Sequence, residues 1–166
     1  MGTGAGPSNR YTDFGVDAGY MFLGDRTHVF GLGGALVQER LSLSRAFGDG
    51  EAERASQRLS KATITASYSY ARTYGASLSM FGTHGSRDFL LNANRTGLPD
   101  SSGMIAQVDW TPFGKEESPL APWLNLRLGL QYTMYGKFDG ARRNYDGAGR
   151  NASDNDTLLA FASFAF

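Results

Sequence analysis

Apolar and polar residues alternate along seven stretches of this chain. The clearest stretch is 62–70, in which the even-numbered residues are Ala, Ile or Tyr and the odd-numbered residues are all Thr or Ser. Successive side chains of a β-strand point to opposite faces, so this period of two predicts a strand with one apolar and one polar face. The predicted strands are 13–22, 28–37, 62–70, 74–82, 103–112, 124–134 and 157–166.

The connections between these strands alternate in length. Segments 23–26 and 71–73 are short, whereas 45–58, 83–102 and 135–156 are long. Segment 113–122, between the fifth and sixth predicted strands, is of medium length and contains two prolines. Several strands joined by short turns and long loops in this order predict an antiparallel, up-and-down arrangement.

The last ten residues form the predicted strand 157–166, and the chain ends on Phe166. The even-numbered face of this strand is wholly apolar, and its length is about the 9–11 residues that cross a bilayer along a tilted path. A strand of this kind that closes on Phe resembles the last strand of Gram-negative outer-membrane β-barrels. The resemblance implies a location in the bacterial outer membrane. It also implies two partners, which are outer-membrane lipid and the barrel-assembly machinery that reads the terminal strand.

Loop lengths and aromatic positions agree with that resemblance. Outer-membrane barrels have short periplasmic turns, long external loops and aromatic girdles at the membrane–water interfaces. Here large aromatic residues gather at strand ends beside the short turns, although aromatic residues also flank turns in soluble sandwiches. The predicted periplasmic girdle is Tyr20, Phe22, Tyr68, Tyr70, Tyr74, Trp110, Trp123, Phe164 and Phe166. The predicted fold is therefore an all-β transmembrane antiparallel up-and-down β-barrel.

Two features of the pattern depart from a complete and regular barrel. Leu41 and Leu43 are odd-numbered, whereas the apolar positions before them are even-numbered, which indicates a bulge or the point where the second strand leaves the bilayer. Bacterial single-chain barrels have an even number of strands, and the alternation predicts seven. We therefore expect the last seven strands of a larger barrel, or a mis-started reading frame. The alternative is an eighth strand at 88–91.

Composition agrees with a single domain of this class. The chain has 166 residues, with 22 Gly and 11 Phe, which suits many short strands and turns. No run of about 18 apolar residues is present, so we expect no transmembrane helix. Lys plus Arg and Asp plus Glu both number 16, so charge gives no support for nucleic acid as a partner. The absence of cysteine excludes thiolate metal sites and covalently attached haem.

The first ten residues differ from the rest of the chain. They are rich in Gly, Pro and Ser, and they contain no apolar stretch of the kind found in a signal peptide. We therefore divide the chain into a flexible tail or linker at 1–10 and the barrel, or its C-terminal part, at 11–166.

The polar strand faces supply the candidate functional residues. Asp17, Asp109, Arg127 and Gln131 are predicted to line the lumen, where charged side chains set the charge preference of a pore. In a barrel of about 16–18 strands such faces line water, and in a small barrel the side chains fill the interior. We predict porin-like passive transport of small solutes. A lumenal ion-pair network that only joins strands is the alternative role for the charged residues.

Other chemistry has weak support in the sequence. His84, Ser86 and Asp88 are close in sequence, but catalytic triads are built from segments that converge in space. The acidic residues of loop 142–156 do not have the spacing of a calcium-binding loop. We therefore predict no catalytic, cofactor-binding or metal-binding residues, and an outer-membrane enzyme is kept as an alternative function.

The C-terminal part of the chain carries a second resemblance. It contains Tyr-Thr-Met-Tyr-Gly-Lys-Phe-Asp-Gly (132–140), Asn-Tyr-Asp-Gly (144–147) and Arg-Asn-Ala-Ser-Asp-Asn (150–155) before the closing strand. This arrangement resembles the end of a family of uncharacterised proteobacterial outer-membrane proteins, some of which sit beside multihaem cytochromes. The resemblance implies an alternative function as a structural barrel sheath for an extracellular electron-transfer complex, with a multihaem cytochrome as the partner that holds the haem.

Overall fold

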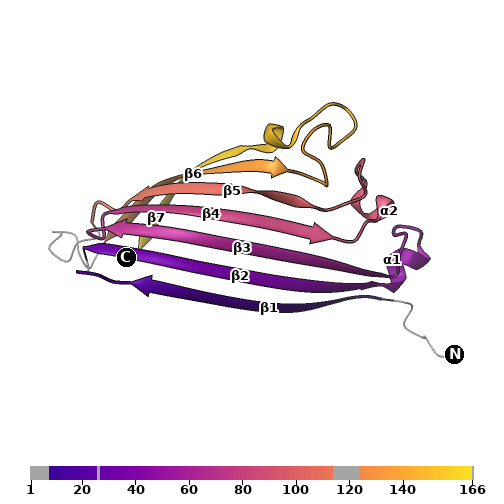
Figure 1. Cartoon of the computed structure of the whole chain (residues 1–166), viewed down its shortest axis with the longest axis horizontal. Helices are drawn as coiled ribbons and strands as arrows, with labels where there is room; N and C mark the ends of the chain where they lie inside the picture. Colours follow the sequence, from indigo (N-terminus) through magenta and orange to yellow (C-terminus); the bar gives the residue numbers. More distant parts are fainter. Residues whose placement is uncertain (1–7, 26, 114–123, 166) are drawn as a thin grey trace.

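The computed structural model describes residues 8–25, 27–113 and 124–165. Within these residues seven strands form one antiparallel sheet, in which each strand pairs with its neighbours in chain order (Figure 1). The described sheet is open, because β1 and β7 each pair with one strand only. The strands are β1 (Asn9–Phe22), β2 (His28–Leu43), β3 (Ser56–Tyr70), β4 (Tyr74–Gly85), β5 (Ser101–Trp110), β6 (Asn125–Lys137) and β7 (Thr157–Ala165).

The structure confirms the all-β, up-and-down arrangement that the alternation predicts. Some strands are longer than predicted: β1 begins at Asn9, inside the predicted tail, β2 continues to Leu43 and β3 begins at Ser56. The long connections contain three short helices, α1 (Ser44–Gly48), α2 (Phe89–Asn92) and the 3-10 helix η1 (Ala152–Asn155). Strand length is underestimated where the outer parts of β2 and β3 lose the strict alternation.

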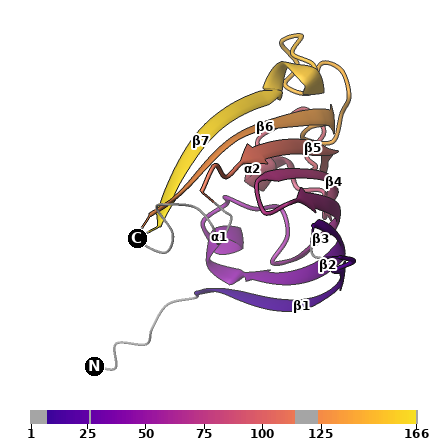
Figure 2. The same cartoon turned by 90° about the vertical axis from the view of Figure 1, so that its left-hand side faces the viewer.

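The sheet is curved, and α1 lies on its concave side (Figure 2). Leu43 packs against α1, so the odd-numbered residues of β2 face the concave side and the even-numbered residues face the convex side. The register pairs odd with odd and even with even residues across the sheet. The exception is a register shift at Ser102 and Gly103, which brings Lys137 opposite Ser102. The predicted polar face is therefore the concave face.

Of the two interpretations of Leu41 and Leu43, a bulge or the point where β2 leaves the bilayer, the bulge is wrong. β2 pairs with β1 and β3 residue by residue through Leu41 and Leu43, without a register shift. Leu43 is 1% exposed and packs with Ala46 of α1 and with Ala52, and Leu41 lies against the same cluster. The apolar residues change face here because α1 and the segment after it cover the concave side of the strand.

The alternative strand at 88–91 is also wrong, because this segment forms α2. Asp88 caps the helix, and its Oδ1 accepts a hydrogen bond from the N–H of Leu91 at 2.9 Å. Ala93 ends the helix in the left-handed conformation, with φ at 47°. A side-chain cap at one end and a left-handed residue at the other fold 88–93 into a helical turn.

The connections lie at opposite ends of the sheet according to their length (Figure 1). We call the end with 23–27 and 71–73 the turn end, and the end with 44–55, 86–100 and 138–156 the loop end. Most of the medium connection between β5 and β6, residues 114–123, lies outside the described residues.

Among the described residues, no helix is long and apolar enough to cross a membrane.

Candidate functional site on the concave face

Asp109 belongs to a row of residues that crosses four strands of the concave face. Gly75 of β4, Asp109 of β5, Gly129 of β6 and Phe161 of β7 are successive partners in the register. Each glycine leaves room for a larger neighbour. A Cβ atom on Gly75 would lie 2.5 Å from Asp109 Oδ2, and a Cβ atom on Gly129 would overlap the ring of Phe161. In this row the carboxylate of Asp109 and the ring of Phe161 therefore each lie beside a glycine.

Arg127 connects the carboxylate with the ring. Its Nη2 donates a hydrogen bond to Asp109 Oδ1 at 2.9 Å, and its guanidinium carbon lies 5.8 Å from the centroid of the Phe161 ring. Gln107 Nε2 donates to the same Asp109 oxygen at 3.3 Å. The side chain of Arg127 is 49% exposed and that of Asp109 is 15% exposed. The guanidinium is therefore open to the concave side, where it can attract an anion or orient a polar solute.

The other two predicted lumen-lining residues lie apart from this ion pair. Gln131 is the register partner of Gln107, so it lies on the concave face one row away from Asp109. Asp17 lies on β1 opposite Ala35, and it makes no hydrogen bond or ion pair with a described residue. The structure thus brings Asp109 and Arg127 together, keeps Gln131 near them and separates Asp17.

Sequence reasoning did not single out Phe161, Gly75 or Gly129. A signal was available, because Phe161 is the aromatic residue on a strand face otherwise made of Thr, Leu, Ser and Ala. The ring of Phe161 fits there because its register partner, Gly129, has no side chain. The alternation alone does not predict the β6–β7 register that pairs these two residues.

The convex face carries a continuous set of apolar residues, which we call the apolar band. It consists of the even-numbered residues in 14–22, 30–36, 62–70, 74–80, 104–110, 126–134 and 158–164, and none of them is charged. Most of its large members are exposed, for example Phe14 at 72%, Leu36 at 59% and Ile64 at 60%. A contiguous exposed apolar surface of this kind marks a site of contact with lipid or with another protein.

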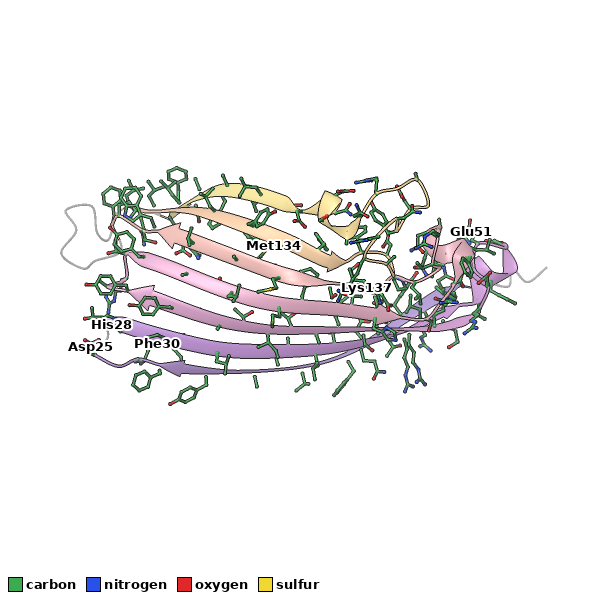
Figure 3. The ribbon with its side chains drawn as sticks, turned by 45° about the horizontal axis from the view of Figure 1, so that its top comes forward. Asp25, His28, Phe30, Glu51, Met134 and Lys137 are labelled. Atoms are coloured by element: carbon green, nitrogen blue, oxygen red, sulfur yellow. The ribbon has the colours of Figure 1, made fainter. Side chains whose placement is uncertain are left out.

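Aromatic rings gather at the turn end of the sheet, where Asp25, His28 and Phe30 lie (Figure 3). Tyr70, Tyr74 and Trp110 are successive register partners on β3, β4 and β5. The other described members of the predicted girdle have even numbers and lie toward the turn ends of their strands; they are Tyr20, Phe22, Tyr68 and Phe164. Trp123 and Phe166 lie outside the described residues.

His28 and Tyr68 link neighbouring rings at the turn end. His28 Nδ1 lies 2.8 Å from the hydroxyl oxygen of Tyr68, and the two rings stack with their centroids 6.1 Å apart. Phe30 also packs against Tyr68, with the two ring centroids 4.8 Å apart. Asp25 Oδ1 accepts hydrogen bonds from the N–H groups of Thr27 and His28, and the bond from His28 is the main reason that the pKa of Asp25 is lowered.

His84, Ser86 and Asp88 do not converge in the structure. His84 Nδ1 lies 2.8 Å from Asp100 Oδ2, and Ser86 Oγ accepts a hydrogen bond from the N–H of Arg58 at 3.0 Å. Asp88 is fully buried among donors of its own. Each of the three side chains therefore has a separate partner, and the geometry of a Ser-His-Asp triad is absent at these positions.

Asp88 joins the segment after α1 to α2. Its Oδ2 accepts hydrogen bonds from the N–H groups of Glu53 at 2.8 Å and Arg54 at 3.3 Å, and from the side-chain amide of Gln57. Its Oδ1 accepts from Leu91, as described above. One carboxylate thus satisfies donors from two loops and from β3, which fixes these segments relative to one another.

Asp100 joins β4 to β6 at the loop end of the sheet. Its Oδ1 accepts a hydrogen bond from the N–H of Gly85 at 3.0 Å, and its Oδ2 pairs with Lys137 Nζ at 3.0 Å and with His84. Burial acts to raise the pKa of Asp100, but the hydrogen bonds from Gly85, Lys137 and His84 outweigh it and hold the pKa below its ordinary value. The carboxylate is therefore ionised and fully engaged at neutral pH.

The acidic residues of loop 142–156 are also engaged locally. Asp146 Oδ1 accepts two backbone N–H groups, and Asp154 Oδ2 accepts the N–H of Asn151 at 2.7 Å. Asp156 joins the loop to β6 by accepting a hydrogen bond from the hydroxyl of Tyr132. In the part of the chain that the structure describes, no three His, Cys, Asp or Glu residues are placed to hold a metal ion.

Comparison of the chain with protein families, with curated proteins and with solved structures gives no match. The sheet itself supplies the functional evidence, which is an apolar convex face, an aromatic turn end and a polar concave face with the ion pair of Asp109 and Arg127.

Proposed function

We propose that the seven strands are a transmembrane wall of an outer-membrane β-barrel that allows small solutes to pass by diffusion. The apolar band lies in lipid, and the concave face with Asp109 and Arg127 faces the lumen. Strands beyond the described sheet close the barrel, because an open sheet edge in hydrocarbon leaves backbone N–H and C=O groups unpaired. The turn end faces the periplasm and the loop end faces outward.

The height of the apolar band is the observation that carries this proposal. On β1 and β3 the band runs over 14–22 and 62–70, which are nine residues each. At about 3.4 Å per residue these spans measure about 27 Å along the strand, or about 20 Å along the membrane normal at a tilt of about 45°. Outer-membrane barrels carry an apolar band of about 25 Å. A soluble protein would have to cover the whole of this exposed surface with other protein.

The aromatic rings at the turn end support the same orientation. Tyr and Trp favour the membrane–water interface because a ring with a polar tip can be partly in lipid and partly in water. Tyr70, Tyr74 and Trp110 form one row at the turn end of the band. A membrane boundary at this level brings their polar atoms to the water side.

The concave face supports passage of polar solutes through the lumen. Small polar side chains line its middle rows, including Ser67 opposite Ser77 and Thr65 opposite Ser79. The Thr65 and Ser79 hydroxyl oxygens are 2.8 Å apart, so these side chains lie along the wall. Arg127 and Asp109 form a pair with little net charge. Asp13, Asp17 and Glu39 add acidic side chains to the same face, so a lumen lined by it favours cations over anions.

Membrane insertion is tested first. The full-length protein is expressed in a Gram-negative host, and the outer membrane is isolated and washed with alkaline carbonate or urea. We expect the protein to stay in the membrane after both washes and to be released by detergent. Recovery of the protein as a water-soluble monomer, without detergent, would contradict the assignment.

Passage is tested by conductance of the purified protein in planar bilayers. We expect stepwise currents with a preference for cations. Arg127→Gln should increase that preference by about twofold or more, because Asp109 loses its counter-charge. Arg142→Gln removes the same charge from an exposed loop and is the matched control. Absence of conductance would reject the pore, and co-purification of a haem protein in that case would favour the barrel sheath.

A further inference from the structure

At the loop end, the convex face changes from apolar to basic within two register rows. The last wholly apolar row contains Val16, Leu36 and Ala62. The next row contains Phe14, Gln38, Ser60 and His84, and the row after it contains Thr12, Arg40 and Arg58. Arg40 lies four positions after Leu36, which is about 14 Å along the strand and about 10 Å along a membrane normal at the tilt used above. Polar headgroups occupy this level of a bilayer.

Arg40 and Arg58 are like charges placed directly opposite each other. Both side chains are exposed, and neither makes a hydrogen bond or ion pair with any described residue. The acidic residues at this level of β1 and β2 are Asp13 and Glu39, whose odd numbers place them on the concave face. Like charges in direct cross-strand contact destabilise a sheet. The pair therefore favours an anion on the convex face that neutralises both guanidinium groups.

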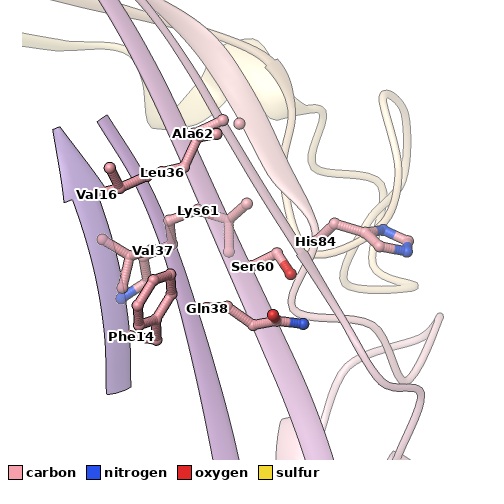
Figure 4. A pocket seen from close by; sticks show the side chains of 11 residues that line it. Phe14, Val16, Leu36, Val37, Gln38, Ser60, Lys61, Ala62 and His84 are labelled. Atoms are coloured by element: carbon pink, nitrogen blue, oxygen red, sulfur yellow. The ribbon is translucent and has the colours of Figure 1, made fainter. Parts of the chain in front are cut away.

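The apolar band contains a hollow (Figure 4), and two of its lining residues, Gln38 and Ser60, lie one register row from the arginine pair. Its volume is about 570 Å³, and its walls include Phe14, Val16, Leu36 and Ala62. Gln38 and Ser60 form the polar side of the hollow toward the arginines. An apolar hollow that ends at two cations matches a molecule with an acyl chain and an anionic head. A free anion would use the arginines and leave the hollow unused.

We propose that Arg40 and Arg58 bind a phosphate group of an anionic membrane lipid whose acyl chain lies in this hollow. Guanidinium groups recognise phosphate by paired hydrogen bonds, and cross-strand partners have Cβ atoms about 5 Å apart, so two such groups reach one phosphate. The proposal rests on the proposed function, because it needs the apolar band to lie in lipid. It adds a specific lipid site on the outer wall, at the outward-facing boundary of the membrane.

The test uses the full-length protein purified in a neutral detergent, with diphosphoryl lipid A as the probe and native mass spectrometry as the readout. We expect lipid A to bind the unaltered protein and to bind Arg40→Gln/Arg58→Gln at least about tenfold more weakly. Arg142→Gln/Arg143→Gln removes two positive charges from an exposed loop and should bind within about twofold of the unaltered protein. Equal binding by the Arg40/Arg58 variant would overturn the proposal.

Two further measurements separate the lipid from other sources. Phosphatidylcholine, whose head has no net charge, should not compete with lipid A, and inorganic phosphate at equal concentration should not displace it. Displacement by inorganic phosphate would identify a free-anion site and reject the lipid. Arg40→Lys/Arg58→Lys keeps the charge but loses the paired hydrogen bonds, so its binding should lie between that of the unaltered protein and that of the Gln variant. Equal far-UV circular dichroism of the three proteins shows that the loss in the Gln variant is not a failure to fold.

Failure of this proposal is distinguishable from failure of the proposed function. A protein that is absent from the washed outer membrane contradicts both. A protein that stays in the outer membrane but binds lipid A equally well with and without Arg40 and Arg58 contradicts the lipid site alone.

Discussion

At the loop end of the sheet, side chains are buried by other parts of the protein, whereas at the turn end the large side chains are exposed. Every buried apolar residue in the described chain belongs to the loop end, and these are Leu43, Ala46, Ala52, Tyr145 and Ala152. At the turn end, Tyr20, Phe22 and Tyr74 are each more than half exposed. The loop end thus has a small core of its own, and the turn end has backbone pairing and ring contacts.

The comparison indicates that the stability of the loop end depends on contacts within the protein, whereas that of the turn end depends on what covers its exposed side chains. Aromatic contacts extend the core of the loop end, since Phe81, Tyr135, Phe138 and Tyr145 form a chain of edge-to-face pairs with centroids 5.0–5.6 Å apart. Such pairs contribute about 0.5–1.5 kcal/mol each beyond the area they bury. Substitutions at the loop end should therefore act through protein contacts, and substitutions in the apolar band should act through lipid or detergent.

Replacement of Asp88 should have the largest effect on stability. Asp88→Ala leaves the N–H groups of Glu53, Arg54 and Leu91 and the amide of Gln57 without their shared acceptor. We expect a loss of about 4 kcal/mol in the free energy of unfolding, measured by urea titration of the protein in detergent micelles.

Asp13→Ala is the matched control for that measurement. Asp13 is an exposed carboxylate on β1 without a described partner, so its loss should change the free energy of unfolding by about 0.5 kcal/mol or less. Equal effects of the two substitutions would show that the buried carboxylate does not organise the loop end.

Truncation of two leucines on the same strand compares the two faces directly. Leu43→Ala removes a side chain that protein encloses, so it should leave a cavity and cost about 3 kcal/mol. Leu36→Ala removes a side chain of the apolar band and leaves no enclosed space, because lipid or detergent fills the gap, so it should cost about 1 kcal/mol. Both values come from urea titration in micelles, and a larger cost for Leu36→Ala would mean that protein covers the band.

Lowering the pH should weaken the loop end through Asp100. The pKa of this carboxyl is lower in the folded protein than in the unfolded chain, so its contribution is present at neutral pH and is lost as the pH falls through the folded pKa, below about pH 4. We expect Asp100→Asn to be less stable than the unaltered protein by about 2 kcal/mol at pH 7. The difference should shrink at low pH, when stability is followed by urea titration between pH 7 and pH 3. A difference that is constant with pH would show that the charge of Asp100 does not matter.

The smallest effect is expected at the turn between β3 and β4, where a substitution should stabilise the protein. Ala71 and Arg72 have φ values of 50° and 56°, and the N–H of Thr73 bonds to the carbonyl of Tyr70, as in a type I′ turn. Glycine adopts this left-handed conformation without steric cost, so Ala71→Gly should raise the free energy of unfolding by about 0.5 kcal/mol. Ala35→Gly, within β2, should lower it by a similar amount, and the same sign for both would contradict the turn geometry.

The alternation of residue types was sufficient to predict the strands and which residues share a face. The prediction is correct for 62–70 and 124–134 because one face of each strand meets a uniform environment, which keeps apolar residues at every second position. The alternation gives a wrong interpretation at Leu41 and Leu43, which face the concave side because α1 covers the strand there. It is also wrong at 88–91, where the carboxylate of Asp88 caps a helical turn. Both failures depend on contacts between segments distant in sequence.

The candidate site was predictable only in part. Asp109 and Arg127 were found because each is a charged residue on a polar strand face. An ion-pair network is one of the two roles predicted for these residues, but the sequence does not show which of them pair, since Asp109 is opposite Gly129 in the register and Arg127 reaches it from two residues away. The Arg40–Arg58 pair likewise depends on the β2–β3 register, which the length of the long connection between them does not fix.

The free edges of β1 and β7 have a consequence for how the chain behaves before it reaches its final environment. On an edge strand every second residue turns its N–H and C=O groups away from the sheet, so about half of the 14 residues of β1 offer an unused ladder. In water, these unpaired backbone groups can pair with a strand of another chain, and the exposed apolar band adds to the tendency to aggregate. Under the proposed function, such a chain requires either rapid insertion into the membrane or a carrier that shields both surfaces during transit.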